Sequence, residues 1–510
     1  MEKKLEICDS VRILEIVEKE GASVHFSGVG GAGMSPLFLM ARRFGISATG
    51  TDIKSSPLLC SLIESGEDIV IGSRSVLPRG TALLVYSHAI GEDDPERRYA
   101  RAAGIPEVTR AEFLASLMTP FSSRISVSGT HGKSTVTAMI YSILKCSGTN
   151  PTALSGASLS LGGSAFALGA LDYMVFEACE YKNSFLAFSP TLSVFTNIEL
   201  DHVDCFRDME SLEDSFLLAM RRAECLVVNA DDTRLYSLAK RSERPYVTLS
   251  LGRENNSHSN SARKIKKSAS FDTEHKNCLP SDTEPDGSQK QLCEYPSAAH
   301  TAIAAEGLRG EAPRAEYTYK ILDTRPRAMK FELFCADESL GIFDLPLLGV
   351  FNIENAALAA AAALSLGVKP ECAREALSSF FGIERRLEAV GKFNTADLYY
   401  DYAHHPTEIR CSIEALRAAY DGRIAVIFSP HTYSRTEHFL SELAEALSLA
   451  DTLLLTPITA ARETDDKRIS SEILAARAGG RVISSRAQLS SFLVGEYSAI
   501  VFMGAGEFNF

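Results

Sequence analysis

A glycine-rich segment, Ser-Gly-Thr-His-Gly-Lys-Ser-Thr-Val-Thr, occupies residues 128–137 and directly follows an apolar run that ends at Val127. This arrangement predicts a strand, a tight turn and a helix, because glycines let the backbone N–H groups approach phosphate oxygens closely. Lys133 would neutralise charge on the outer phosphates, and the hydroxyl of Ser134 or Thr135 could bind Mg²⁺. The start of the helix adds the positive end of its dipole. We therefore expect a loop that binds ATP, formed by Gly129, Thr130, His131, Gly132, Lys133, Ser134 and Thr135.

The length and composition are those of a soluble globular protein with several domains. A chain of 510 residues is longer than a domain with one hydrophobic core usually is, so about two to four domains are expected. The hydrophobic content of 45% and the charged content of 23% are ordinary for such a protein. No apolar run approaches the ~20 residues needed to cross a bilayer, so no membrane association is expected.

The net charge limits the possible binding partners, and the cysteine content indicates the cellular compartment. A net charge of −13 argues against nucleic acid as the main partner. The 11 cysteines are scattered without a paired framework, which is typical of a reducing compartment. The charged N-terminus lacks an apolar signal region, so a cytoplasmic location is expected, as a monomer or a homodimer.

Short apolar runs alternate with amphipathic stretches along most of the chain, which predicts parallel sheets covered by helices. We expect an α/β protein of three consecutive domains: a Rossmann-like domain at 1–118, a central phosphate-loop domain at 119–382 and a second Rossmann-like domain at 383–510. Residues 252–314 have few large apolar side chains and no sustained period, which predicts a disordered insertion, with a small folded subdomain as the alternative. Helices are expected at Gly33–Phe44, Asn352–Leu366, Pro406–Tyr420 and Thr436–Leu449.

A second glycine cluster follows the first predicted strand. Its glycines, Gly28, Gly30, Gly31 and Gly33, match the G-x-G-x-x-G pattern that opens a helix at a pyrophosphate site. Asp52 ends the next strand, where a carboxylate could accept a hydrogen bond from a ribose hydroxyl. NAD and a nucleotide-sugar diphosphate fit this cluster equally well, and a tight turn without a ligand is the plainer alternative.

Acidic and imidazole groups follow two further predicted strands. Glu177 and Glu180 end one of them, and Asp201 and His202 come after the next. Ligands in open α/β sheets gather at the carboxyl ends of strands, and Mg²⁺ prefers oxygen ligands, so Glu177 is a natural ligand beside the phosphate loop. His202 could also bind Mg²⁺, or it could instead orient a metal ligand or cap a helix.

The last third of the chain carries Asp401-Tyr-Ala-His-His-Pro at one strand end and Ser429-Pro-His-Thr-Tyr-Ser-Arg435 at the next. The planar fork of an arginine suits the binding of a carboxylate. A surface ion pair is the alternative for Arg435 alone. The two polar clusters at neighbouring strand ends together indicate a ligand-binding site at this edge of the predicted sheet.

These clusters, in this order, resemble the Mur ligase family, within it the type that attaches the first amino acid to UDP-N-acetylmuramate. The resemblance rests on the following motifs along nearly the whole chain outside 252–314: His25-Phe-Ser-Gly-Val-Gly-Gly-Ala-Gly-Met-Ser, Ser87-His-Ala-Ile, Gly104-Ile-Pro with Arg110-Ala-Glu, the Gly129–Thr135 loop, Glu177-Ala-Cys-Glu-Tyr, Thr196-Asn-Ile-Glu-Leu-Asp-His, Gly349-Val-Phe-Asn-Ile-Glu-Asn-Ala, Arg385-Arg-Leu-Glu and Asp401-Tyr-Ala-His-His-Pro-Thr-Glu.

The resemblance implies a ligase that uses ATP and Mg²⁺ to join L-alanine to the lactyl carboxylate of UDP-N-acetylmuramate through an acyl phosphate, in peptidoglycan precursor synthesis. It implies catalytic roles for Lys133, Glu177 and His202, and a magnesium site of Ser134, Glu177 and His202. It also places Asn352 and Asn355 near adenine, Arg386 and Asp401 near the ATP phosphates and ribose, the Gly28–Gly33 loop and Asp52 on the UDP-sugar, and His431 and Arg435 on the amino acid.

The chain departs from the family pattern at several positions. Ser134 replaces a threonine, Cys179 a common aspartate and Thr432 a common arginine. Three alternatives stay open: a ligase that attaches a preformed peptide to the same sugar nucleotide, an NAD-dependent oxidoreductase, and a nucleotide-binding protein without catalysis.

Overall fold

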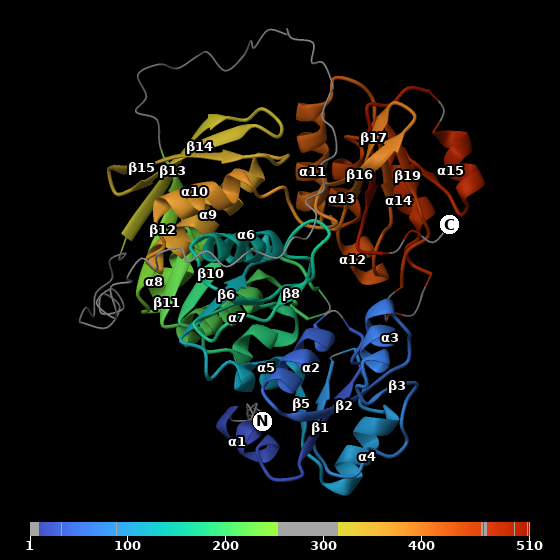
Figure 1. Cartoon of the computed structure of the whole chain (residues 1–510). Coiled ribbons are helices and arrows are strands. Elements are labelled where there is room, and N and C mark those ends of the chain that lie inside the picture. Colours follow the sequence, from blue (N-terminus) through green and yellow to red (C-terminus); the bar gives the residue numbers. More distant parts are fainter. Residues whose placement is uncertain are drawn as a thin grey trace, which may run out of the picture. The chain divides into compact units, whose positions relative to one another are not determined.

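The computed structural model describes residues 10–31, 33–87, 89–203, 205–252, 315–460, 463, 467–493, 495–506 and 508. These residues form three β-sheets in chain order, each accompanied by helices (Figure 1). The predicted α/β class with three consecutive domains is therefore confirmed. The predicted insertion lies outside the described residues, apart from Gly252.

The first sheet has five parallel strands in the order β3-β2-β1-β4-β5. The central strand β1 is buried throughout, and the chain order of the strands reverses between β1 and β4, so the carboxyl end of β1 opens onto a crevice where ligands bind in such folds. The elements are β1 (Ser23–Ser27), β2 (Ser47–Asp52), β3 (Ile69–Ile71), β4 (Thr81–Tyr86), β5 (Glu107–Thr109), α1 (Ser10–Val17), α2 (Met34–Arg43), α3 (Pro57–Glu64), α4 (Pro95–Ala103) and α5 (Arg110–Leu117).

The middle sheet has ten strands in the order β15-β14-β13-β12-β11-β10-β6-β9-β7-β8. Strand β6 lies between β9 and β10, parallel to both, so the ends of these three strands meet at one edge. The strands are β6 (Ser123–Ser128), β7 (Thr152–Leu154), β8 (Phe166–Ala167), β9 (Tyr173–Glu177), β10 (Leu192–Phe195), β11 (Cys225–Asn229), β12 (Tyr246–Leu251), β13 (Ala315–Asp323), β14 (Met329–Cys335) and β15 (Glu338–Leu345). The helices are α6 (Lys133–Cys146), the 3₁₀ helix η1 (Tyr181–Ala187), α7 (Met209–Arg222), α8 (Thr233–Arg241), α9 (Phe351–Ser365) and α10 (Pro370–Ser378).

Strands β13, β14 and β15 form an antiparallel extension of this sheet, which the sequence reading missed. Met329, Phe331 and Leu333 of β14 are buried and alternate with less buried Lys330 and Glu332, as in a strand with one covered face. The alternation was present in the sequence, but no element was expected between 315 and 345.

The alanine-rich helix α9 is buried on nearly every side, and it packs against α6, the helix that follows the phosphate loop. Small side chains let the two helices approach closely, so α9 brings its first turn to the loop.

The third sheet has six strands in the order β16-β17-β21-β18-β19-β20, of which only β16 pairs antiparallel. Its elements are β16 (Glu388–Phe393), β17 (Ala396–Asp401), β18 (Ile424–Phe428), β19 (Thr452–Leu455), β20 (Arg481–Val482), β21 (Ala499–Met503), α11 (Pro406–Ala419), α12 (Tyr433–His438), α13 (Leu440–Leu447), α14 (Ser471–Ala478) and α15 (Arg486–Phe492). The single helix expected at Thr436–Leu449 is wrong: α12 and α13 are separated at Phe439, whose φ of −100° and ψ of 23° break the helical path. The ring of Phe439 packs 4.9 Å from the ring of His405.

One hydrophobic core runs from the first sheet into the middle sheet. It includes Phe113 and Leu117 of α5 together with Phe176 of β9 and Phe185 of η1. Helix α5 is thereby held against the segment that follows β9, close to Glu177. Among the described residues, no helix combines the length and apolar character that a membrane crossing requires.

Candidate active site

The phosphate loop lies between β6 and α6, as the sequence predicted. Gly129 has φ +136°, and a Cβ there would lie 2.1 Å from Oγ1 of Thr196. Gly132 has φ +80° and caps α6, and a Cβ there would lie 2.6 Å from Oδ1 of Asn355. Both positions therefore require glycine, one for its contact with the end of β10 and one for its contact with α9.

The loop is fixed by the segment that follows β10. The Thr130 and His131 N–H groups donate to the carbonyl oxygen and the side-chain oxygen of Asn197, at 3.1 and 2.8 Å. Thr130 Oγ1 donates to the Glu199 carbonyl at 2.9 Å and accepts from the Glu199 N–H at 2.8 Å. These bonds preorganise the loop.

Lys133 lies half-buried at the centre of this loop. Its Nζ donates to the carbonyl oxygens of Gly129 and Thr130, at 2.6 and 3.0 Å, and lies 3.2 Å from a carboxylate oxygen of Glu180. Burial opposes the charged form, but the negative charge of Glu180 outweighs it and raises the pKa of Lys133. Lys133 is a fixed cation at the start of α6.

Ser134 and Glu177 face each other across the loop. Ser134 Oγ donates to Oε2 of Glu177 at 2.8 Å, and the Gly156 N–H donates to the same oxygen at 2.8 Å. A hydroxyl oxygen beside a carboxylate fits the oxygen ligands that Mg²⁺ prefers. These two residues could hold the cation that a bound triphosphate brings.

His202, the third predicted metal ligand, has Glu180 and not Glu177 as its carboxylate neighbour. The distance from His202 Nε2 to Glu180 Oε1 is 3.6 Å, and Cys179 lies in the same cluster. Burial raises the pKa of the Cys179 thiol to about 12. The structure thus brings Ser134 and Glu177 together, with His202 in an adjoining group around Glu180.

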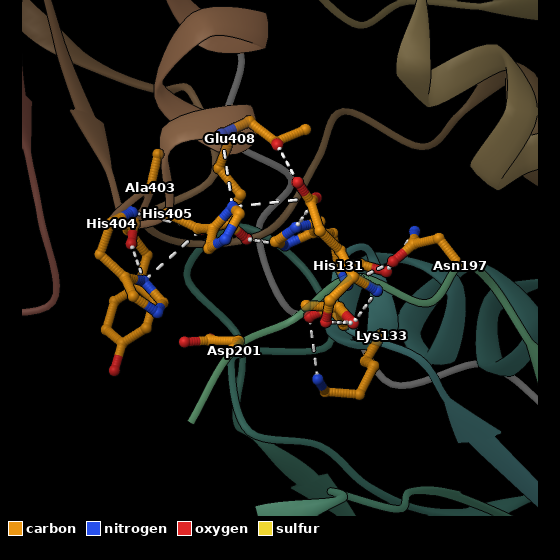
Figure 2. Close-up of polar contacts among 12 residues, drawn as sticks. His131, Lys133, Asn197, Asp201, Ala403, His404, His405 and Glu408 are labelled. Atoms are coloured by element: carbon orange, nitrogen blue, oxygen red, sulfur yellow. Dashed lines mark hydrogen bonds and ion pairs between the residues drawn. The ribbon is translucent and has the colours of Figure 1, made fainter. Parts of the chain in front are cut away.

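His131 connects the loop to the first turn of α11 (Figure 2). Its Nε2 lies 2.9 Å from Glu199 and its Nδ1 lies 3.3 Å from Glu408, which also pairs with Arg386 at 3.2 Å. Burial disfavours the imidazolium, but hydrogen bonds to Glu199 and Glu408 outweigh it and raise the pKa of His131 to about 9. His131, Glu199 and His405 also form a possible metal cluster, but an imidazolium between two carboxylates is already satisfied and is no ligand.

A cavity of about 490 Å³ adjoins the loop. The predicted nucleotide residues Asn352, Asn355, Arg386 and Asp401 all line it, together with Glu354 and Phe351. Asn355 donates to Asn352 at 3.1 Å, and Asn352 donates to the Leu348 carbonyl at 2.8 Å, so each amide keeps groups for a ligand.

Asp401 is buried beneath this cavity. It accepts hydrogen bonds from Ser412 Oγ and from the Ala403 N–H, the latter at 3.2 Å. Burial raises its pKa to about 6, although the Ser412 hydrogen bond and the charge of Arg386 act in the opposite direction.

Arg435, predicted to hold a carboxylate, is already paired with one. Its Nε and Nη2 lie 3.1 and 2.9 Å from Oδ1 of Asp201, and Nη2 lies 3.1 Å from Oδ2. Burial acts against it, but Arg435 lowers the pKa of Asp201 far below its ordinary value. His431 lies in the loop after β18, where its backbone bridges to Thr459.

In the first domain, the glycine cluster forms the predicted turn at the end of β1. Gly28 has φ +78°, and its N–H donates to the Thr51 carbonyl at 2.8 Å. Asp52 accepts from the Gly30 N–H at 2.8 Å and from the Lys54 N–H at 2.9 Å, so its carboxylate holds the turn itself. Gly31 lies inside the turn, and Gly33 caps α2.

Glu199 and Glu408 are site residues to which the sequence gave no role, and Asp201 was predicted only as one of the acids beside the phosphate loop. Glu408 follows His404 by four residues at the start of a predicted helix, so its position on the same face was a usable signal. Asp201 and Glu199 offered only their place after a strand. Their partners lie 234 and 208 residues away in the chain, in Arg435 and Thr407, and only folding brings these together.

The fold and this site define a three-domain α/β protein with a phosphate-binding loop. The chain belongs to the Mur ligase family: the profile described as Mur ligase family, catalytic domain, matches residues 23–122, the Mur ligase middle domain matches 127–283, and the Mur ligase, glutamate ligase domain, matches 385–506.

Named relatives and solved structures agree with this. The chain is 34% identical over 452 residues to the UDP-N-acetylmuramate–L-alanine ligase of Caldicellulosiruptor bescii, covering 88% of this chain and 86% of the relative. It is 33% identical to the enzyme of that name from Acetivibrio thermocellus, with 89% and 85% covered. The crystal structure of UDP-N-acetylmuramate-alanine ligase MurC from Thermotoga maritima has a TM-score of 0.69 at 22% identity, with 95% and 96% covered, and shows the same fold.

Proposed function

We propose that this chain is an ATP-dependent ligase that joins L-alanine to the lactyl carboxylate of UDP-N-acetylmuramate. The observation that carries the proposal is the phosphate loop with Lys133 and the Ser134–Glu177 pair at its mouth. The relatives named for this reaction match nearly the whole chain and support the choice of substrates.

In the first step, a carboxylate oxygen of the sugar nucleotide attacks the γ-phosphorus of ATP. The new O–P bond forms as the bond between that phosphorus and the β,γ-bridging oxygen breaks, and ADP leaves. Two anions must meet, so charge neutralisation dominates, and Lys133 supplies it from a fixed position. Ser134 and Glu177 would hold Mg²⁺, which would supply further neutralising charge.

In the second step, the amine nitrogen of L-alanine attacks the acyl carbon. The carbon–oxygen bond to phosphate breaks, inorganic phosphate leaves, and the nitrogen gives up a proton, for which we propose His202 as the acceptor. Arg435 is proposed to bind the amino acid's carboxylate, sharing its fork with Asp201. The loop contacts to α11 support closure around the acyl phosphate, which water would otherwise hydrolyse.

The test is ADP formation by the purified chain with ATP, Mg²⁺ and UDP-N-acetylmuramate, for each member of an amino-acid panel. We expect L-alanine to trigger turnover, with glycine and L-serine as the nearest competitors. A murein tripeptide serves as the substrate of the peptide-adding alternative, and NAD binding tests the oxidoreductase alternative. ADP formation with the tripeptide and not with L-alanine would contradict the assignment.

Lys133→Ala tests the role of the phosphate loop in this turnover, with Arg98→Ala as its control. Removing one charge of this kind lowers the rate by ~10²–10³ or more. Arg98→Ala, at an exposed position on α4, should leave turnover unchanged. We also propose that the enzyme works in the cytoplasm, where its nucleotide substrates are made.

A further inference from the structure

Arg110 begins α5, and its position is rigidly set. Thr109 and Glu112 form a reciprocal capping box at the start of this helix, with the Thr109 N–H 2.7 Å from Glu112. Phe113 and Leu117 of the same helix lie in the core that joins the first and middle sheets. The side chain of Arg110 therefore starts from a fixed backbone between two domains.

The guanidinium group of Arg110 lies against the glycine turn of the first domain. A Cβ on Gly33 would lie 2.9 Å from Nη1 of Arg110 and 3.1 Å from its Cζ, so any larger residue at 33 would displace the guanidinium. Gly33 is also the N-cap of α2, whose Met34 and Ser35 N–H groups donate to the Gly31 carbonyl at 2.8 and 3.1 Å. A guanidinium at a helix N-terminus is electrostatically unfavourable by itself, because both are positive.

The opposite side of Arg110 faces the middle domain. Burial lowers the pKa of Arg110, and the negative charge of Glu177 opposes this effect. Arginine stays protonated in proteins, so this burial leaves a desolvated cation. Arg110 thus lies between the turn of the first domain and the group that carries the Ser134–Glu177 pair.

Arg110 differs from the other cations of the site in having no acceptor. Lys133 pairs with Glu180, Arg386 with Glu408 and Arg435 with Asp201. Within the described part of the chain, no residue accepts a hydrogen bond from the Arg110 guanidinium or forms an ion pair with it. Its nitrogens are not among the buried polar atoms that lack a partner, so they reach solvent and are available to an anion from outside the chain.

We propose that Arg110 is an anion-binding residue for the sugar-nucleotide substrate, holding one of its acidic groups between the Gly33 turn and Glu177. The inference rests on the proposed function. The acidic group is either the diphosphate, which would lie beside the glycine turn, or the carboxylate that is to be phosphorylated. In either case Arg110 places the substrate so that its carboxylate reaches the γ-phosphate.

The experiment compares wild type with Arg110→Ala, Arg110→Gln and Arg110→Lys in steady-state kinetics. We expect KM for UDP-N-acetylmuramate to rise roughly 10- to 100-fold in the alanine and glutamine variants, with the KM values of ATP and L-alanine unchanged. Lysine, which keeps charge but not the fork, should lie in between. Added guanidinium ion should restore part of the activity of Arg110→Ala, which a merely structural role would not produce.

Binding of two ligands to the same variants distinguishes the two sources of the anion. If Arg110 holds the diphosphate, affinity for UDP-N-acetylglucosamine, which lacks the lactyl carboxylate, falls as much as affinity for UDP-N-acetylmuramate. If Arg110 holds the carboxylate, only the second affinity falls.

Arg98→Ala is the matched control, and thermal unfolding of each variant is compared with wild type. If Arg110→Ala unfolds, Arg110→Gln, which keeps most of the stem, decides the question. Wild-type KM values in a folded, active Arg110→Gln variant would overturn the inference and leave the ligase assignment intact. Absence of turnover in wild type would instead refute the ligase assignment.

Discussion

Glu354, a residue of α9, is a carboxyl group in an unfavourable setting at the edge of the nucleotide cavity. Burial, with the charges of Asp231 and Asp232, raises its pKa to about 7. Oε1 accepts a hydrogen bond from Asn229 at 2.9 Å, and no cation is paired with it among the residues that the structure describes. Close to neutral pH, its protonation therefore changes both the charge of the cavity and the stability of the fold.

The pKa of Glu354 is higher in the folded state than the ordinary value of 4.5, so the folded state binds the proton more tightly. Stability is then lost as pH rises from about 4.5 to about 7, and stays constant above that. Glu354→Gln should be more stable than wild type by about 3 kcal/mol at pH 8. The advantage should vanish near pH 4.5.

The measurement is the urea-unfolding midpoint of both proteins across this pH range. Glu414→Gln, at an exposed site on α11, is the control and should follow wild type. A stability difference for Glu354→Gln that does not vary with pH would show that the carboxyl titrates normally.

At the scale of elements, the phosphate loop depends on contacts between segments distant in the chain. Gly129 lies against Thr196, and Gly132 against Asn355, so β6, β10 and α9 must be assembled before the loop takes its shape. The loop is thus part of the packing of the sheet.

This packing makes a prediction for Gly129→Ala. Its Cβ would overlap Thr196 Oγ1 and would require a backbone of φ +136°, which L-residues rarely adopt. We expect a loss of about 2–4 kcal/mol in stability and loss of ATP binding. Gly104→Ala, at φ +69° with no atom within 4 Å of an added Cβ, carries only the backbone strain of about 1 kcal/mol and should bind ATP normally. Thermal unfolding and nucleotide titration check both; normal ATP binding by Gly129→Ala would contradict the steric argument.

The strand–turn–helix units were predictable, because each is encoded by neighbouring residues. The strands Ile424–Phe428 and Ala499–Met503 have the predicted bounds, and the helix expected at Gly33–Phe44 is Met34–Arg43. No pattern in the sequence marked the break at Phe439, whose ring contacts His405 on another element. The antiparallel pairing of β13, β14 and β15 was not predictable either, because it depends on which strand lies at the edge of the sheet.

At the scale of the whole molecule, the Asp201–Arg435 pair joins the segment after β10 to α12. It is buried and uses both oxygens of the carboxylate. Such a pair is a weak source of net stability, but its rupture leaves an uncompensated charge. It also occupies the guanidinium proposed for the amino acid, so binding of the amino acid and the contact between the two segments are coupled.

A double-mutant cycle measures this contact. Asp201→Asn should cost about 3–5 kcal/mol, because Arg435 is left buried without a counter-charge. Asp201→Asn with Arg435→Gln should cost less than the sum of the single changes, by at least about 1 kcal/mol. Urea unfolding at pH 7 provides the values, above the range where Asp201 takes up a proton. The more exposed Glu213–Arg234 pair is the control, and its coupling energy should be about 0–1 kcal/mol. Additive costs at the buried pair would contradict the predicted coupling.

The amino-acid sequence by itself determined the phosphate loop, the glycine turn after β1 and the class of fold. Each of these depends on residues a few positions apart, whose backbone preferences and apolar spacing act locally. Only the tertiary structure decided that Ser134 meets Glu177, that His202 faces Glu180, that Asp201 pairs with Arg435 and that Arg110 lies against Gly33. Strand order and the packing between sheets set those distances, and both depend on residues that lie far apart in the chain.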